Sequence, residues 1–352
     1  MLFLKLGDKI LIPGDENIKR ISNIFYPIIK ILRTEANGNF EYSIEDDIVL
    51  ISGNEEVLRI PIEVFKEKSI FLLNHIKSKP KGAFTIPEIE DFMLTVNCLS
   101  LKANSSVKTD ITIVIHDQRT NQQPILGFSI KSQLGEASTL FNAVQSSNFI
   151  YEVMGVEMTN EEINEINSLF IKRKNKLLRD VKRRTKTIFQ KGGNLLFIGV
   201  EKPVFSNNLM LIDSLLPNIL SQIVIPYYLG DSALITELVN NIEKANPLNF
   251  DITNKHEFYR YKMKRFLTDT ALGMLPGKVW NGKYDATGGY LVVKEDGDIL
   301  CYHLYNRNEF EDYLINNTKL ETPSSSRHKF GDLYKENEKL FFKLNLQIRF
   351  IK

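Results

Sequence analysis

The sequence contains little cysteine and no long hydrophobic run. Its 352 residues include only two cysteines, Cys98 and Cys301, which argues against a disulfide framework or a structural zinc site. The N-terminal stretch, residues 1–7, is too short for a signal peptide, and no later stretch reaches the apolar length that spans a bilayer. The sequence therefore predicts a soluble protein of the reducing cytoplasm that has no membrane partner.

An excess of charge of one sign is also missing. The 45 Lys and Arg residues nearly balance the 43 Asp and Glu residues, for a formal net charge of +2, so any affinity for nucleic acid must come from local clustering. The five histidines show no metal-ligand spacing, and there is no Gly-rich phosphate loop, dinucleotide fingerprint or Gly-x-Ser-x-Gly elbow. These absences argue against the enzyme classes that depend on such motifs.

The pattern of apolar residues predicts an α/β protein with a substantial core. Helices are expected over residues 15–34, 65–76, 85–94, 159–186, 209–229, 256–267 and 310–315, and the helix at 85–94 is expected to open with a capping box at Thr85 and Glu88. Strands are expected over residues 40–44, 48–51, 56–62, 109–116, 126–132, 195–200 and 342–350, with two more between 288 and 303.

Two of these strands, at residues 109–116 and 126–132, are joined by a polar turn and form the most informative stretch. Side chains alternate between the two faces of a strand, so Ser129, Lys131 and Gln133 share one face. An antiparallel hairpin of these strands would bring Asp110 near Lys131. The sequence thus predicts a carboxylate and an ammonium group close together on neighbouring strands.

This pair has a chemical use. A carboxylate can hold Mg²⁺, and the metal and a lysine together can stabilise a phosphodiester that gains charge during attack by water. The arrangement is typical of metal-dependent nucleases. On spacing alone, however, a solvent-facing hairpin with an incidental ion pair is the more common explanation.

Three groups of polar residues are candidates for contact with DNA. The basic run over 172–186 is expected to continue the helix that starts at Thr159, and its charges would surround most of the helix. The second group lies in a Ser-rich loop, and the third lies on one face of the last strand. An ordinary exposed surface explains each group almost as well. The candidates are Lys182, Arg183 and Arg184 in the first group, Arg327, His328 and Lys329 in the second, and Gln347 and Arg349 in the third.

Several stretches together carry a resemblance to a known family. They are the hairpin with Leu126-Gly127-Phe128-Ser129-Ile130-Lys131-Ser132, the segments 139–143 and 148–151, Ala271-Leu272-Gly273-Met274, Thr287-Gly288-Gly289, and the ending Leu344-Asn345-Leu346-Gln347-Ile348-Arg349-Phe350. In these stretches the chain resembles the HpaII-type family of restriction endonucleases, and the resemblance extends over nearly the whole chain.

The resemblance implies a type II restriction endonuclease on a PD-(D/E)xK core that cuts double-stranded DNA with Mg²⁺, with CCGG as the expected target. Asp110 would be the metal-binding carboxylate and Lys131 the lysine of the xK element. Ser129 stands where the family of folds usually has an acid. Glu136 is the first candidate for the second acid, and Glu88, Glu90 and Asp91 are alternatives; Gln133 would assist as a neutral ligand.

The implied fold is a central mixed β-sheet flanked by helices, with an additional C-terminal α+β region. Three regions are expected, an N-terminal α+β region at 1–85, a nuclease core with the basic helix at 86–245 and a DNA-recognition region at 246–352, unless the chain is one continuous domain. A homodimer is one expected assembly, and a cognate DNA methyltransferase is the expected functional partner of such an enzyme.

Two rival functions stay open. Ser129 motivates a DNA-binding protein that keeps the fold but has lost metal chemistry. So does the start of the chain, which lies close to where an additional Glu-bearing helix of family members would end. A repair or junction nuclease with the same core is the second rival, and it would cut by DNA structure rather than at a fixed sequence.

Overall fold

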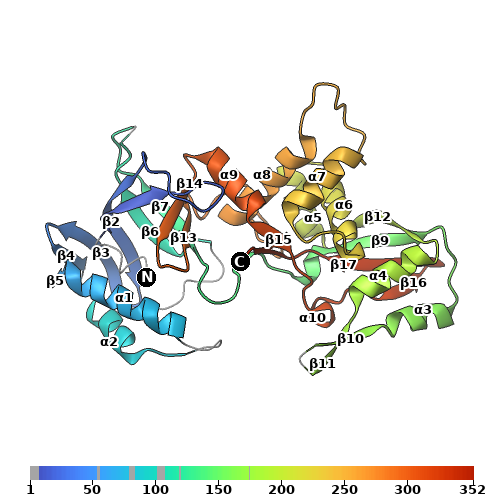
Figure 1. The fold of residues 1–352 in the computed structure, drawn as a ribbon, viewed down its shortest axis with the longest axis horizontal. Coiled ribbons are helices and arrows are strands. Elements are labelled where there is room, and N and C mark those ends of the chain that lie inside the picture. Colours follow the sequence, from blue (N-terminus) through green and yellow to red (C-terminus); the bar gives the residue numbers. More distant parts are fainter. Residues whose placement is uncertain (1–7, 54–55, 79–83, 101–107, 119, 174) are drawn as a thin grey trace. The chain divides into compact units, whose positions relative to one another are not determined.

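The computed structural model describes residues 8–53, 56–78, 84–100, 108–118, 120–173 and 175–352 (Figure 1). The chain forms two compact units, and each is assembled from separate stretches of sequence. Unit 1 contains residues 1–138, 284–313 and 352, and unit 2 contains 139–283 and 314–351. The expected regional boundaries near residues 85 and 245 do not coincide with the changes of unit, and the three-region division stays a prediction.

Unit 1 is organised around a mixed sheet of nine strands in the order β1-β14-β13-β7-β6-β2-β3-β4-β5. Strand β1 also pairs with β2, so it links two strands that are separated in this order. The strands are β1 (Ile10–Pro13), β2 (Tyr26–Glu35), β3 (Gly38–Glu45), β4 (Ile48–Gly53), β5 (Glu56–Pro61), β6 (Ile111–Ile115), β7 (Ile125–Ser132), β13 (Gly289–Val293) and β14 (Ile299–His303).

The predicted hairpin lies at the centre of this sheet. Strands β6 and β7 are antiparallel, with Ile111 opposite Phe128, and β13 pairs with β7 in parallel, with Tyr290 opposite Ser129. The apolar side chains of β6 and β13 are buried, as expected for strands covered on both faces. The mixed α/β class and the hairpin within a central mixed sheet are therefore confirmed.

Two helices, α1 (Ile62–Ser78) and α2 (Pro87–Thr95), cover part of this sheet (Figure 1). Ile62 and Phe65 of α1 and Phe92 of α2 join the apolar side chains of β3, β4, β6 and β7 in one buried cluster. This burial removes the helices' apolar faces from water. Helix α9 (Arg307–Asn316) follows β14.

Unit 2 contains two larger sheets and most of the helices. Strands β12, β9, β17 and β16 form one sheet, β15, β18 and β8 form another, and β10 pairs with β11. The strands are β8 (Thr139–Phe141), β9 (Asn148–Met154), β10 (Phe170–Arg173), β11 (Lys176–Arg179), β12 (Asn194–Val200), β15 (Thr318–Leu320), β16 (Leu333–Glu336), β17 (Lys339–Asn345) and β18 (Ile348–Phe350). The helices are α3 (Asn160–Asn167), α4 (Val181–Gln190), α5 (Pro203–Ile212), α6 (Leu216–Leu229), α7 (Ile235–Ala245), α8 (Phe258–Leu272) and α10 (Ser325–His328).

Among the helices that the structure describes, none is long and apolar enough alone to cross a membrane. Only α5 and α6 taken together meet the length and composition of a span, and they meet at an angle of 108°.

The helix predicted over 15–34 is wrong. Residues 26–35 form strand β2, in which Pro27 lies opposite Ile10 of β1 and Ile31 lies opposite Ile113 of β6. Isoleucine is β-branched and packs well on a pleated sheet, so tertiary pairing overrides the helix-like spacing of this run.

The single helix predicted over 159–186 is also wrong. A helix does start at the expected place, where Thr159 and Glu162 form a capping box for α3, but the chain then turns into the hairpin β10–β11 before α4 begins. Asn175 lies in the turn of this hairpin with φ of 62°, a left-handed conformation that Asn tolerates better than most residues. Asp180 then caps α4 by accepting a hydrogen bond from the Arg183 backbone N–H at 3.1 Å.

Three smaller predictions need correction. Helix α2 begins after Ile86 without a side-chain cap, so the capping box at Thr85 is wrong although the helix is present. The long helix over 209–229 is two helices, α5 and α6. The last strand is interrupted: β17 ends at Asn345 and β18 starts at Ile348, and the two belong to different sheets.

A buried carboxylate ties β2 to the segment after α2. Glu35 is 6% exposed and accepts hydrogen bonds from the Ser100 backbone N–H at 2.9 Å and from Arg33 Nε at 2.8 Å. Burial alone raises the pKa of Glu35, but the hydrogen bonds from Ser100 and Arg33 outweigh burial and hold it below its ordinary 4.5. The charged form is therefore the one that stabilises the fold.

We expect Glu35→Gln to lower the free energy of unfolding by about 2 kcal/mol at neutral pH, because hydrogen bonds to a buried charge are lost. Since the folded pKa is depressed, the difference from wild type is full above the ordinary pKa and shrinks as the pH falls through the folded value. Urea titrations followed by circular dichroism at several pH values test this. Glu41→Gln breaks an exposed pair with Lys30 and should change stability by less than about 0.5 kcal/mol; an equal loss in both variants would contradict the argument.

Candidate active site

Asp110 lies just before β6, where its carboxylate is held against β7. Its backbone N–H donates to Phe128 O at 2.8 Å, and its Oδ2 accepts from the Ile130 backbone N–H at 2.7 Å and from the Ser129 hydroxyl at 3.1 Å. The side chain is nevertheless exposed. The carboxylate is thus oriented through one oxygen, and its other oxygen accepts no hydrogen bond from the described residues.

Lys131 lies two residues after Ser129 on β7 and on the same face of the strand. Its Nζ is 5.0 Å from the centre of the ring of Tyr290, a fully buried residue of the adjacent strand β13. Burial lowers the pKa of Lys131, and the charge of Asp110 acts in the opposite direction. The structure thus brings Asp110 and Lys131 within electrostatic range of each other, without a direct ion pair between them.

Ser129 fills the usual acid position and has a different role there. It is 2% exposed and donates its hydroxyl hydrogen to Asp110, so it orients the carboxylate and supplies no negative charge. The Gln133 backbone N–H donates to Val293 O at 2.8 Å just after β7, and Glu136 is exposed in the following segment. In the described ranges no group of three His, Cys, Asp or Glu side chains could hold a metal, so the second acid stays a prediction.

Lys108 and Thr109 cross the Lys131 face of β7 next to Asp110, and the sequence analysis missed them. The Thr109 hydroxyl donates to Asp285 O at 2.6 Å, and the Lys108 backbone N–H donates to Asp285 Oδ2 at 3.3 Å. The chain can pass here because Gly127 has no side chain: a Cβ added to it would lie 2.6 Å from Thr109 Oγ1. Burial, and then the nearby charge of Lys131, lower the pKa of Lys108 to about 8, while Asp285 and Asp110 act against this shift.

Comparison with known proteins assigns the family. The model of the family described as HpaII restriction endonuclease matches residues 1–350. The chain belongs to the HpaII restriction endonuclease family. It is 46% identical over 353 aligned residues to the type II restriction enzyme HpaII of Haemophilus parainfluenzae, with 99% of this chain and 95% of that protein covered. No solved structure matches this HpaII family member.

The family match confirms two predictions, the resemblance to HpaII-type enzymes and the enzyme class, a type II restriction endonuclease. It does not test the site residues. Asp110, Ser129 and Lys131 are brought together by the fold of unit 1, whereas all the residues predicted to contact DNA lie in unit 2.

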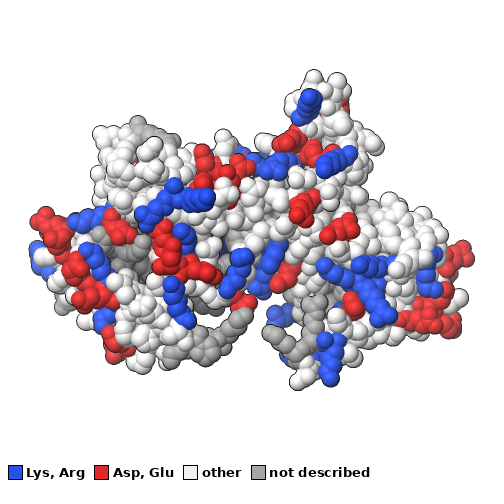
Figure 2. All heavy atoms as spheres, viewed as in Figure 1, with Lys and Arg blue, Asp and Glu red and all other residues white. Residues whose placement is uncertain are grey.

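The basic run of this HpaII family member is divided between a hairpin and a helix. Figure 2 shows Lys and Arg side chains gathered over α4 of unit 2. Arg183 is exposed, and Lys182 Nζ lies 4.0 Å from the centre of the Tyr227 ring. Lys174 lies outside the described residues. Arg183 and Lys182 remain candidates for contact with phosphates.

Arg184 requires a correction, because it is fully buried and cannot reach DNA in this structure. Its guanidinium donates to Gly331 O at 2.7 Å, to Leu169 O at 3.2 Å and to Asn167 O, and it pairs with Asp332 at 2.5 Å. The side chain therefore joins α4 to the segments on either side of it. Its guanidinium therefore holds segments of unit 2 together and is not part of a basic surface.

The single polar face predicted for the last strand does not form. Because β17 and β18 belong to different sheets, Gln347 falls between two strands and Arg349 pairs with Glu321 at the edge of β15. Of the loop residues, Arg327 and Lys329 are exposed, while His328 is partly buried at the end of α10. Burial, and then Arg327, lower the pKa of His328.

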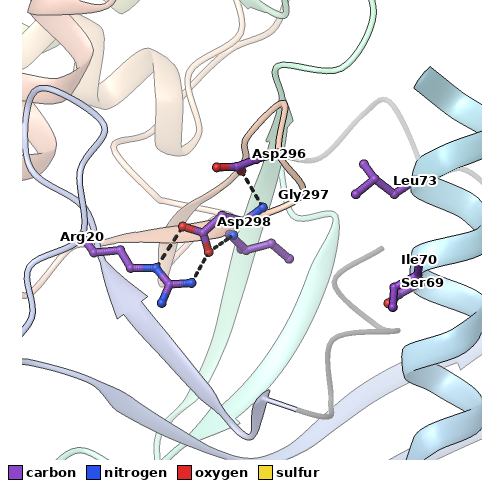
Figure 3. Close-up of a pocket in the computed structure, with 8 residues that line it drawn as sticks. Arg20, Ser69, Ile70, Leu73, Asp296, Gly297 and Asp298 are labelled. Carbon is purple, nitrogen blue, oxygen red and sulfur yellow. Dashed lines mark hydrogen bonds and ion pairs between the residues drawn. The ribbon is translucent and has the colours of Figure 1, made fainter. Parts of the chain in front are cut away.

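A separate pocket of about 420 Å³ lies in unit 1 at the β13–β14 turn (Figure 3). Arg20 bridges across it to Asp298, at 2.6 Å and 3.0 Å between guanidinium nitrogens and carboxylate oxygens, and Leu73 of α1 lines the opposite side. The carboxylate of Asp298 in this pocket is already paired with Arg20. The pocket contains neither Asp110 nor Lys131, so we do not assign it to the candidate active site.

Proposed function

We propose that this HpaII family member cuts double-stranded DNA at CCGG with Mg²⁺ on a PD-(D/E)xK core. The observation that carries the proposal is the arrangement of Asp110 beside β7 with Lys131 two residues after Ser129 on that strand. The name of the relative from Haemophilus parainfluenzae supports the type of enzyme. The mixed sheet that contains both residues supports the proposed core.

The residues fit a magnesium ion of the kind that works with a phosphate substrate. Mg²⁺ prefers oxygen ligands and is commonly held by one or two carboxylates together with water and substrate phosphates. Asp110 offers one exposed carboxylate oxygen, since Ser129 and Ile130 engage the other. Glu136 is the proposed second acid. When bound, the metal would supply positive charge next to the phosphate that is being attacked.

The chain's own residues would divide the remaining work. Lys131 would orient the attacking water and offset the negative charge that the phosphate gains in the transition state. The ammonium nitrogen of Lys131 lies 5.0 Å from the centre of the Tyr290 ring, and this cation–π contact would help to hold it in place. Gln133 would assist as a neutral ligand at the end of β7. Ser129 would keep the carboxylate of Asp110 in one orientation.

In unit 2, exposed basic residues are proposed to contact the DNA backbone and bases. They are Arg183, Arg327 and Lys329, together with the partly exposed Lys182, and His328, Gln347 and Arg349 are further candidates for base contact. A homodimer would present two such sites to a palindromic target. A cognate methyltransferase would protect the host's own sites.

Plasmid digestion tests this function and separates it from its rivals. We expect linear products with Mg²⁺, no cutting in EDTA, and sequenced ends that all map to CCGG. Tight binding without cutting would support the DNA-binding protein that Ser129 suggested. Ends with no common sequence would support a repair nuclease that recognises DNA structure.

A further inference from the structure

We propose that Lys108 is a second substrate-contacting cation, which binds the scissile phosphodiester of DNA together with Lys131. This inference rests on the proposed function and adds to it a residue that no motif identifies. It concerns the face of β7 that Lys108 and Thr109 cross.

Hydrogen bonds to Asp285 hold the backbone of Lys108 and Thr109 on this face. The Thr109 hydroxyl and the Lys108 backbone N–H both donate to Asp285, at 2.6 Å and 3.3 Å. Gly127 leaves the space for this crossing, because a side chain there would meet Thr109 and the Asp285 carbonyl. Since residues 127, 129 and 131 point to the same face of β7, the backbone of Lys108 is fixed on the face that carries Lys131.

The positive charges on this face of β7 are not balanced by ion pairs in the part of the chain that the structure describes. Several other lysines of unit 1 have close partners: Lys30 pairs with Glu41 at 2.7 Å and Lys294 with Asp296 at 3.3 Å. Among the described residues, neither Lys108 nor Lys131 forms an ion pair with a carboxylate, although both are partly buried and both belong to the same face of β7. Two such cations repel, and an anion between them would relieve the repulsion.

The neighbouring carboxylate of Asp110 indicates which anion this is. Asp110 lies two residues from Lys108, and its carboxylate is the proposed metal-binding group of the cleavage site. The anion that reaches this face during the reaction is the phosphodiester under attack. Two lysines next to it would offset the charge that develops on its oxygens. Lys108 therefore fits the same phosphate as Lys131, and Asp285 acts as its positioning residue.

A thermodynamic cycle between Lys108 and that phosphate tests the proposal. The cleavage ends of the wild-type enzyme locate the scissile phosphate, and one duplex is then made with a neutral methylphosphonate at that position. Dissociation constants are measured in EDTA for wild type and Lys108→Met on both duplexes. We expect Lys108→Met to weaken binding about tenfold on the natural duplex and hardly at all on the neutral one.

Matched variants distinguish a lysine that contacts the phosphate from a lysine that is needed only for folding. Lys108→Arg keeps the charge and should keep most of the coupling, whereas Lys294→Met removes a paired lysine elsewhere in unit 1 and should show none. Lys108→Met should melt at the wild-type temperature or above, since an unpaired, partly buried cation is removed. A residue needed only for folding would lower the melting temperature instead.

Each outcome has one reading. The inference about Lys108 is overturned if Lys108→Met weakens binding equally on both duplexes. If Lys131→Met still weakens binding only on the natural duplex, the proposed function stands without a role for Lys108. If the wild-type protein cuts no DNA, the proposed function fails and this inference fails with it.

Discussion

Replacing Asp110 by asparagine is expected to slow DNA cleavage by at least about 10³-fold, or about 4 kcal/mol of transition-state stabilisation. Asparagine keeps an oxygen that can accept from the Ile130 N–H and the Ser129 hydroxyl, but it replaces the remaining carboxylate oxygen by an NH₂ group. The variant should therefore fold normally and bind DNA in EDTA as tightly as wild type. Single-turnover digestion of a CCGG duplex with Mg²⁺ measures the rate.

Glu45→Gln is the control for this loss. Glu45 is an exposed carboxylate of β3 in the same unit, and its conversion to an amide should leave the cleavage rate unchanged. If Asp110→Asn still cut DNA, the metal-binding carboxylate would be a different residue, and Glu136 or the acids of α2 would be tested next. Equal slowing of both variants would point to a general effect of charge.

Arg184→Met should destabilise unit 2 by about 3 kcal/mol, because the hydrogen bonds of a fully buried guanidinium to backbone carbonyls are lost. The substitution removes the Arg184 donor from Gly331 O and Asn167 O. Leu169 O keeps its bond from the Asp180 N–H, and Asp332 keeps its pair with Arg179. The chain has one tryptophan, Trp280, and it belongs to unit 2. Urea unfolding followed by tryptophan fluorescence therefore reports on this unit.

The neighbouring residue provides a matched control. Arg183 is exposed on the same helix, so Arg183→Met should change stability by less than about 0.5 kcal/mol and should instead reduce the salt dependence of DNA binding. Arg184→Lys should not restore stability, because one ammonium group cannot reach the several acceptors that a guanidinium serves. If Arg184→Met weakened DNA binding with no loss of stability, the buried role would be wrong.

The centre of the fold could be predicted from the sequence because its signals are local. Apolar residues alternate or run continuously along β6 and β7, and a short polar turn joins the two strands. Their pairing can therefore be predicted without knowledge of contacts to residues far away in the sequence. The same holds for the hairpin of β13 and β14 and for the helix that starts at Thr159. The closeness of Asp110 to Lys131 follows from the first of these hairpins.

The rest depends on contacts between distant residues. Tyr290 lies beside Ser129 only because β13 pairs with β7, and Lys108 reaches this face only because Thr109 bonds to Asp285. The sequence around β7 and the sequence around Lys108 contain no pattern that predicts these contacts. The isoleucines around residue 28 show the opposite error, since their helix-like spacing was overruled by pairing with β1 and β6.

The parallel pairing of β7 with β13 also has a consequence for synthesis on the ribosome. The two strands come from segments about 160 residues apart, as the bond between Gly127 and Thr287 shows, and most of unit 2 is made between them. A nascent chain that ends before β13 already contains Asp110 and Lys131, yet its β7 is an open edge without Tyr290. Such an edge can pair with other chains. Interrupted translation is thus expected to yield aggregation-prone fragments rather than a partly active nuclease.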